Sequence, residues 1–372
     1  MALTKVDQTM VNDQVFGRRN LIINGAMRVA QRGTSATALT SGGLFLLDRF
    51  KGIESTNGAA TVEQSTDTPA GFAKSLKLAV TTADTDMGGG QYSQIKYVVE
   101  AQDLQRLNYG TSDAETITLS FWVKSSKTGT YCISIVKHDS TAYFYVKEYT
   151  ISSANTWEKK TITITPTAGS TTFITNSAGA IADDNGDGLQ LGWFLSAGTT
   201  YNGATDDAWS SNSNHYATSN QVNWMDNTSN DFYLTGVQLE VGDNATPFEH
   251  LTFGEELTLC QRYYQKYGPY GTNVYPLGPS GYCYAGTAHA LGHNPIVSLR
   301  ANPDLEITGT LQIRGAQNDG GNDARDVASA TVTLGNNSIL WNVNAAAGAT
   351  IGTTPIVGGG TNTTFFAYDS EL

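Results

Sequence analysis

The chain has 372 residues, of which 40% are hydrophobic and 15% charged, and its formal net charge at pH 7 is −12. This length is enough for about two domains, each with its own buried core. Because affinity for nucleic acid rests largely on Lys and Arg that neutralise phosphates, the acidic balance excludes a generic nucleic-acid-binding surface. The 39 glycines and the low share of charged residues favour short strands joined by tight turns, so we predict a mostly β protein.

The cysteines and the N-terminal residues indicate the cellular compartment in which the protein folds. Cys132, Cys260 and Cys283 are widely spaced, and such an odd, sparse set favours free thiols in a reducing cytoplasm over a disulfide framework. The opening MALTKVDQTM lacks the apolar core of a signal peptide, and no apolar run reaches the length of a membrane span. We therefore expect a soluble protein without membrane insertion and without a recognisable export signal.

Residues 1–42 differ from the rest of the chain. An apolar patch of Leu21, Ile22, Ile23 and Met27 stands among arginines in GRRNLIINGAMRVAQRG. A patch this short cannot form a core alone, so it must pack against something else. One interpretation is that it packs on its own domain. The other, which we favour, is that it contacts symmetry mates or a larger assembly.

Residues 43–250 show one strand pattern after another. In ETITLSFWVKSS, every second residue is apolar and suited to one buried face: Ile117, Leu119, Phe121 and Val123. About nine such segments, separated by clusters of Gly, Asn, Asp and Thr, predict two antiparallel sheets packed face to face in a jelly-roll sandwich. The connections 165–188 and 199–230 are long, and long loops at the end of a sandwich often carry function.

The stretch 251–268 is predicted to be a linking helix. Thr252 and Glu255 have the spacing of a capping box, and Gly268 followed by a proline is a stop signal. Four further residues recur at helical spacing and would share one face: Leu257, Cys260, Tyr264 and Tyr267. One chain alone is not expected to bury this face, so we predict that these four residues pack at or near a threefold axis.

Residues 269–372 are predicted to form a smaller C-terminal β-sandwich module. DLEITGTLQI alternates apolar and polar residues, and ATVTLGNNSILWNV is typical of a hairpin that turns near Gly335. Four tyrosines open this module and could stack on sugar rings: Tyr270, Tyr275, Tyr282 and Tyr284. We take them as the candidate receptor-binding residues.

Two long motifs, GRRNLIINGAMRVAQRGTS and GVQLEVGDNATPFEHLTFGEELTLCQRYYQKYG, carry a family resemblance. With them the chain resembles bacteriophage tail-fibre and receptor-binding proteins, and VSLRANPDLEI and FFAYDSEL resemble the C-terminal module of the same proteins. The resemblance implies a homotrimeric fibre in the virion. Residues 1–42 would attach to tail or baseplate proteins through Leu21, Ile22, Ile23 and Met27. A carbohydrate-binding-like sandwich would follow, and residues 269–372 would bind a host glycan or outer-membrane protein.

Two alternatives to a tail-fibre adhesin stay open at this point: a polysaccharide depolymerase tailspike, and a structural fibre of the head or baseplate. Catalysis would need a nucleophile with a nearby base, or two carboxylates facing a cleft. The five histidines are scattered, and the acidic residues show no distinctive spacing. We therefore expect no catalytic residues.

Aromatic residues also gather in the loop at 199–230. They are Tyr201, Trp209, His215, Tyr216 and Trp224. Sugar stacking is one interpretation of this group, because a flat ring can cover the apolar face of a pyranose. We favour the other interpretation, in which these residues anchor the loop by packing.

Metal binding is considered at two places. Asp183, Asn185 and Asp187 fit the first half of a calcium loop, but Phe194 stands where a bidentate Glu would be needed. A single Ca²⁺ site is one interpretation of this stretch, and a polar turn is the other. His289 and His293 have the spacing of a zinc pair on a helix, which the neighbouring Gly and Pro argue against. We expect no other cofactor.

Overall fold

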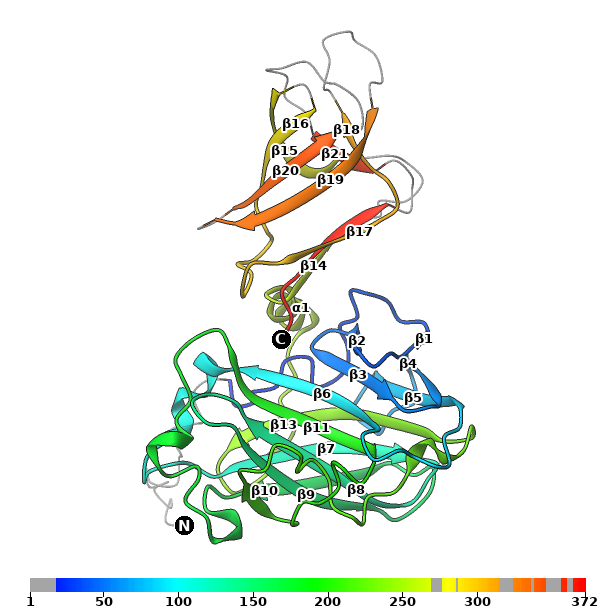
Figure 1. Cartoon of the computed structure of the whole chain (residues 1–372), viewed down its shortest axis with the longest axis vertical. Coiled ribbons are helices and arrows are strands. Elements are labelled where there is room, and N and C mark those ends of the chain that lie inside the picture. The colour runs from blue at the N-terminus through cyan, green and yellow to red at the C-terminus, as the bar shows by residue number, and fades with distance from the viewer. Residues whose placement is uncertain are drawn as a thin grey trace, which may run out of the picture. The chain divides into compact units, whose positions relative to one another are not determined.

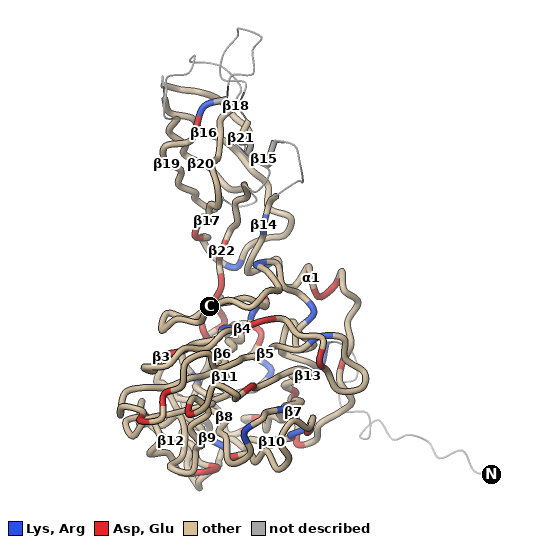
Figure 2. The backbone as a smooth tube through the Cα atoms, turned by 90° about the vertical axis from the view of Figure 1, so that its right-hand side faces the viewer, with Lys and Arg blue, Asp and Glu red and all other residues tan. Residues whose placement is uncertain are grey.

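The computed structural model describes residues 18–268, 276–285, 287–314, 324–335, 338–345, 356–359 and 364–372. Apart from Leu372, they fall into two compact units that divide after Glu256, and both units are built of antiparallel strands (Figure 1). In the first unit, basic and acidic residues are interspersed along the chain (Figure 2). Within the described part, no helix combines the length and apolarity needed to cross a membrane.

The first unit is a sandwich of two sheets, as the sequence predicts. The six-stranded sheet has, in spatial order, β1 (Thr37–Ala38), β4 (Ala59–Ser65), β5 (Ser75–Thr82), β13 (Asp231–Val241), β7 (Ile117–Ser125) and β10 (Glu158–Ile164). The seven-stranded sheet has β12 (Ala208–Ser210), β9 (Tyr143–Ile151), β8 (Gly129–Lys137), β11 (Asp187–Ala197), β6 (Tyr92–Glu100), β3 (Phe50–Ser55) and β2 (Leu44–Leu47). Short 3₁₀ helices lie between strands: η3 (Ala101–Leu107), η4 (Ala168–Ser170), η5 (Ser177–Gly179) and η6 (Trp224–Asp226).

The core of this unit follows from the alternation of side chains along the strands. The four residues predicted for the buried face of β7 are all fully buried: Ile117, Leu119, Phe121 and Val123. From the opposite sheet, β11 contributes another alternating set to the same core: Leu189, Leu191, Trp193 and Leu195. Two antiparallel sheets that share one apolar interior confirm the predicted jelly-roll sandwich.

The segment that follows Arg18 belongs to this sandwich. The four apolar residues assigned to virion attachment are buried within the chain itself: Leu21, Ile22, Ile23 and Met27. The backbone N–H of Leu21 donates to the carbonyl of Leu239, and that of Val237 donates to Gly25. The segment therefore covers β13 near the register shift between Thr235 and Gln238. Our favoured interpretation, contact with a larger assembly, is wrong for these four side chains, because their own domain covers them.

Asn24 holds this segment in place. Its backbone is in the left-handed region, with φ of 61°. Its amide nitrogen donates to the carbonyls of Val29 and Asp48 at 2.8 and 2.9 Å, and its amide oxygen accepts from the N–H of Val29 at 2.9 Å. Its own N–H donates to the carboxylate of Glu256, in the second of the two long motifs. The backbone N–H of Asn24 thus links the first motif to the second, and its side chain fixes the first motif to Asp48.

The predicted linking helix is shorter than expected. The helix α1 spans Phe253–Gln261, and Thr252 and Glu255 form the predicted capping box, with the Glu255 N–H donating to the Thr252 hydroxyl at 3.4 Å. The chain then turns into the strand β14 (Tyr264–Tyr267), which pairs with β22 (Phe365–Asp369). The expectation of one helix over 251–268 is wrong because this long-range pairing outweighs local helical periodicity.

The predicted threefold face is therefore not a helix face. Cys260, Tyr264 and Tyr267 are buried by their own chain, and Leu257 is half-buried. Tyr267 stacks on Phe366, with ring centroids 4.9 Å apart and an interplanar angle of 16°. These contacts remove the reason to expect a threefold axis at these four residues.

The second unit combines a closed barrel with a small sheet, where the sequence predicts a sandwich. The barrel contains, in order, β15 (Pro276–Ala285), β16 (Ala288–His293), β20 (Ile339–Ala345), β19 (Ala324–Leu334), β18 (Leu311–Arg314) and β21 (Ile356–Gly359). The small sheet has the order β14, β22, β17 (Asp304–Thr308). Alternating strands suit a sandwich and a barrel equally well, and closure depends on the β15–β21 and β18–β21 pairings between distant segments. The predicted hairpin near Gly335 is confirmed by the pairing of β19 with β20.

The role of Asn24 can be tested by comparing two asparagines with the same backbone conformation. Asn24→Ala should lower the free energy of unfolding by about 3 kcal/mol, because it leaves buried backbone groups without partners. Asn155 also has a left-handed backbone, with φ of 55°, but its side chain is exposed. Asn155→Ala should therefore cost only about 1 kcal/mol, the penalty of the backbone conformation alone. Equal losses for both variants in urea denaturation would show that the Asn24 hydrogen bonds do not stabilise the unit.

Candidate binding site

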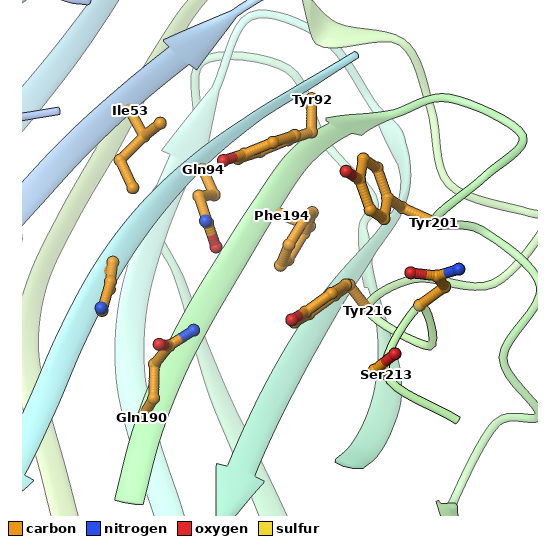
Figure 3. Close-up of a pocket in the computed structure, with 10 residues that line it drawn as sticks. Ile53, Tyr92, Gln94, Gln190, Phe194, Tyr201, Ser213 and Tyr216 are labelled. Atoms are coloured by element: carbon orange, nitrogen blue, oxygen red, sulfur yellow. The ribbon is translucent and has the colours of Figure 1, made fainter. Parts of the chain in front are cut away.

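A pocket of about 370 Å³ lies on the outer face of the seven-stranded sheet, the face turned away from the sandwich core (Figure 3). Strands β3, β6 and β11 form its base, and the loop after β11 forms one wall. The lining residues are Ile53, Tyr92, Gln94, Lys96, Gln190, Phe194, Tyr201, Ser213, Asn214 and Tyr216. Segments that are distant in sequence therefore meet at one place.

Strand alternation explains which residues reach this pocket. On β6, Ile95 and Tyr97 point into the core, so Tyr92, Gln94 and Lys96 point outward. On β11, the core residues alternate with a second outward set: Gln190, Gly192 and Phe194. The same two strands thus supply both the sandwich core and the base of the pocket.

Four aromatic rings form a continuous cluster in the pocket. Tyr216 stacks on Phe194, with centroids 5.5 Å apart and an interplanar angle of 25°. Tyr201 makes edge contacts with Tyr92 at 5.4 Å and with Tyr216 at 5.8 Å. Phe194 is only 2% exposed, whereas the three tyrosines are half-buried. Phe194 is therefore the floor of the cluster, and the tyrosines remain accessible as its walls.

The tyrosine hydroxyls are suited to bind a polar ligand. Figure 3 shows the hydroxyl ends of Tyr92, Tyr201 and Tyr216 on the side of the rings that faces Gln94 and Gln190. Burial raises the pKa of Tyr92 and of Tyr216, and nearby tyrosines raise both further. Both phenols therefore stay protonated at neutral pH and can donate as well as accept.

Gln94 and Gly192 shape the base of the pocket. Gln94 is 6% exposed, and among the described residues its side-chain oxygen has no hydrogen-bond partner. An unpaired buried acceptor costs free energy unless a ligand or water supplies a donor. A Cβ atom on Gly192 would lie 2.9 Å from this oxygen and 3.1 Å from the Phe194 ring. Glycine at position 192 therefore keeps the space above Gln94 open.

The loop aromatics divide into two groups. Trp209 and Trp224 are buried, as expected of packing anchors. His215 is held by its neighbours, since its ring nitrogens lie 2.9 Å from the Ser210 hydroxyl and from the Asn212 amide. Tyr201 and Tyr216 instead line the pocket, so the packing interpretation describes only part of this group.

Two of the four tyrosines predicted to bind a receptor are described by the structure, and they do not line this pocket. Tyr282 and Tyr284 are on β15, 56% and 51% exposed, with ring centroids 6.3 Å apart. Tyr270 and Tyr275 fall outside the described residues.

The two places considered for metal binding gain no further ligands among the described residues. In the described part of the chain, no three His, Cys, Asp or Glu side chains come together in a way that could hold a metal ion. Asp187 is the first residue of β11, and the Asp184 carboxylate accepts from the Gly186 N–H, as expected for the polar-turn interpretation of 183–187. His293 lies on β16 with its Nδ1 atom 2.8 Å from the Tyr368 hydroxyl.

Sequence reasoning missed the strand residues of the pocket. Gln94, Lys96 and Gln190 stand at polar positions of otherwise ordinary alternating strands, which by themselves indicate only solvent exposure. Gly192 was a usable signal, because a glycine inside a strand often marks a place where a ligand or another backbone approaches closely.

Comparisons with known proteins show low similarity. No family model matches the chain, and no curated protein matches it. Among solved structures, the enzymatically active domain of tailspike protein 4 of bacteriophage CBA120 is 12% identical, covering 60% of this chain and 21% of that one, with a TM-score of 0.30. A putative sugar binding protein from Bacteroides thetaiotaomicron is 10% identical, covering 60% and 100%, with a TM-score of 0.34.

A family 16 carbohydrate-binding module is 16% identical, covering 59% of this chain and 99% of that one, with a TM-score of 0.26. The chain thus spans only 21% of the tailspike domain but nearly all of the two smaller proteins. Because these identities and TM-scores are low, we argue the function from the geometry of this chain.

The different positions of Phe194 and Tyr201 in the cluster predict different effects on stability. Phe194→Ala should lower the free energy of unfolding by about 3 kcal/mol, because it leaves a cavity under the stacked rings. Tyr201→Ala should cost less than about 1 kcal/mol, since its ring is half-exposed. Urea denaturation of both variants measures the difference. A loss for Tyr201→Ala as large as that for Phe194→Ala would mean that Tyr201 is structural and is not available to a ligand.

Proposed function

We propose that the first unit binds a glycan in the pocket formed by Tyr92, Tyr201, Tyr216 and Gln94. The observation that carries this proposal is the combination of half-buried aromatic walls with an unpartnered amide oxygen at the base. Flat rings can cover the apolar face of a pyranose, and amide and phenol groups can pair with its hydroxyls. Aromatic side chains together with a few convergent polar groups are a common lining of small-ligand sites.

The chemistry of the lining favours binding over hydrolysis. Glycoside hydrolysis commonly needs two carboxyl groups on either side of the bond to be cleaved. Among the described residues that line this pocket there is no Asp or Glu. We therefore propose an adhesin, with a depolymerase tailspike as the alternative.

The biological setting that we propose is a bacteriophage tail fibre that binds a glycan on the host cell. The resemblance of the two long motifs to tail-fibre proteins supports this setting, and the hydrogen bond between Asn24 and Glu256 gives the motifs a common structural role. In a homotrimeric fibre attached to tail or baseplate proteins, several weak sites would act together and raise avidity without new contacts. A structural fibre of the head or baseplate is the remaining alternative.

The location of the binding site can be tested on an array of bacterial surface polysaccharides. Tyr201→Ala and Gly192→Val should each reduce binding at least about ten-fold, the first by removing a stacking surface and the second by filling the pocket. The double variant Tyr282→Ala with Tyr284→Ala is the matched control in the second unit and should bind normally. Loss of binding in the control variant alone would move the site to the barrel.

The setting in a virion can be tested with gold-labelled antibody against this protein on intact phage particles. We expect label at the tail, where a fibre can reach the host surface first. Label at the head would contradict the proposed tail fibre, but it would not contradict the proposed glycan site.

A further inference from the structure

Lys96 is a half-buried cation in the pocket that forms no salt bridge with any described residue. Five other lysines of the first unit do form salt bridges with carboxylates: Lys77, Lys124, Lys127, Lys147 and Lys160. Lys96 stands directly opposite Gly192 in the ladder of β6 and β11, so no side chain projects from the partner position. Lys96 is the one lysine among the described residues that line the pocket.

A second lysine lies beside the first. Lys51 on β3 is the direct ladder partner of Lys96, so both side chains project from the same face of the sheet. Lys51 also forms no salt bridge with a described residue, but it does not line the pocket, because its Nζ atom lies 5.3 Å from the centre of the Phe45 ring on β2, at the other side of β3. Like charges directly opposite each other on neighbouring strands are destabilising.

The electrostatic surroundings agree with this geometry. Burial lowers the pKa of Lys96, and the charge of Lys51 lowers it further, while Asp187 raises it. Asp187 is thus the carboxylate whose charge acts on Lys96, but it forms no salt bridge with it. A bound anion would offset both the desolvation of Lys96 and its repulsion by Lys51.

We propose that the pocket selects glycans carrying an anionic group, a carboxylate or a sulfate ester, which Lys96 binds while the tyrosines hold the sugar ring. This inference rests on the proposed function and names its ligand class. Hydrogen bonds between a charged donor and a charged acceptor are stronger than those between neutral groups. With a net charge of −12, the protein as a whole repels polyanions. Selection therefore depends on an anionic group that reaches Lys96 inside the pocket.

Calorimetric titration of the full-length protein with matched tetrasaccharides tests the inference. The probes are alginate tetramers and their carboxyl-reduced forms, and carrageenan tetramers and their desulfated forms. At least one anionic tetramer should bind about ten-fold or more tightly than its neutral counterpart. Alginate carries carboxylates and carrageenan carries sulfate esters, so comparing the two sets shows which anionic group the pocket prefers.

Substitutions link this preference to the lysines. Lys96→Met should reduce binding of the anionic tetramer to the level of the neutral one, whereas Lys96→Arg should retain the preference. Lys159→Met, on the exposed face of β10 in the other sheet, is the matched control and should change nothing. Thermal unfolding of each variant checks that it is folded.

Two results would overturn the inference, and they differ in what they imply for the proposed function. Equal binding of anionic and neutral tetramers that is insensitive to Lys96→Met but lost in Tyr201→Ala would contradict the anion preference alone. Absence of binding to every tetramer by the unaltered protein would contradict both the preference and the proposed glycan site.

Discussion

The alternation of side chains along β6 and β11 is the constraint on which both the fold and the site depend. These neighbouring strands lie in the interior of the seven-stranded sheet, so each must fill the sandwich core with every second residue. The residues that alternate with these core residues face outward and are free to differ in chemistry. Tyr92, Gln94 and Lys96 occupy such positions and line the pocket. A shift of either strand by one residue would exchange the two faces and destroy the core and the pocket together.

The N-terminal segment and the end of the sandwich depend on each other. Asn20 donates to the carbonyl of Val237 at 3.1 Å, and the Glu249 carboxylate accepts from the backbone N–H of Asn20 at 2.8 Å. Together with the bond between Asn24 and Glu256, these contacts fix the start of the described chain to the residues that leave β13. The first motif and the part of the second motif up to Glu256 are therefore one structural element of the first unit.

Much of the fold could be predicted from the sequence, because local periodicity determines strands and their buried faces. The core face of β7 and the hairpin between β19 and β20 are examples. What could not be predicted depends on long-range pairing: β14 replaces the end of the expected helix, and closure of β15 on β21 makes a barrel. The pocket was missed for the same reason, since Lys96 and Tyr216 meet only after the loop folds over the sheet.

A crystal structure of the full-length protein with its tightest-binding tetrasaccharide tests the central claim most directly. The account predicts a sugar ring against Tyr201 or Tyr216, a sugar hydroxyl donating to the side-chain oxygen of Gln94, and an anionic group near Lys96. A sugar bound only to the exposed tyrosines of the barrel, with the pocket containing water alone, would contradict it.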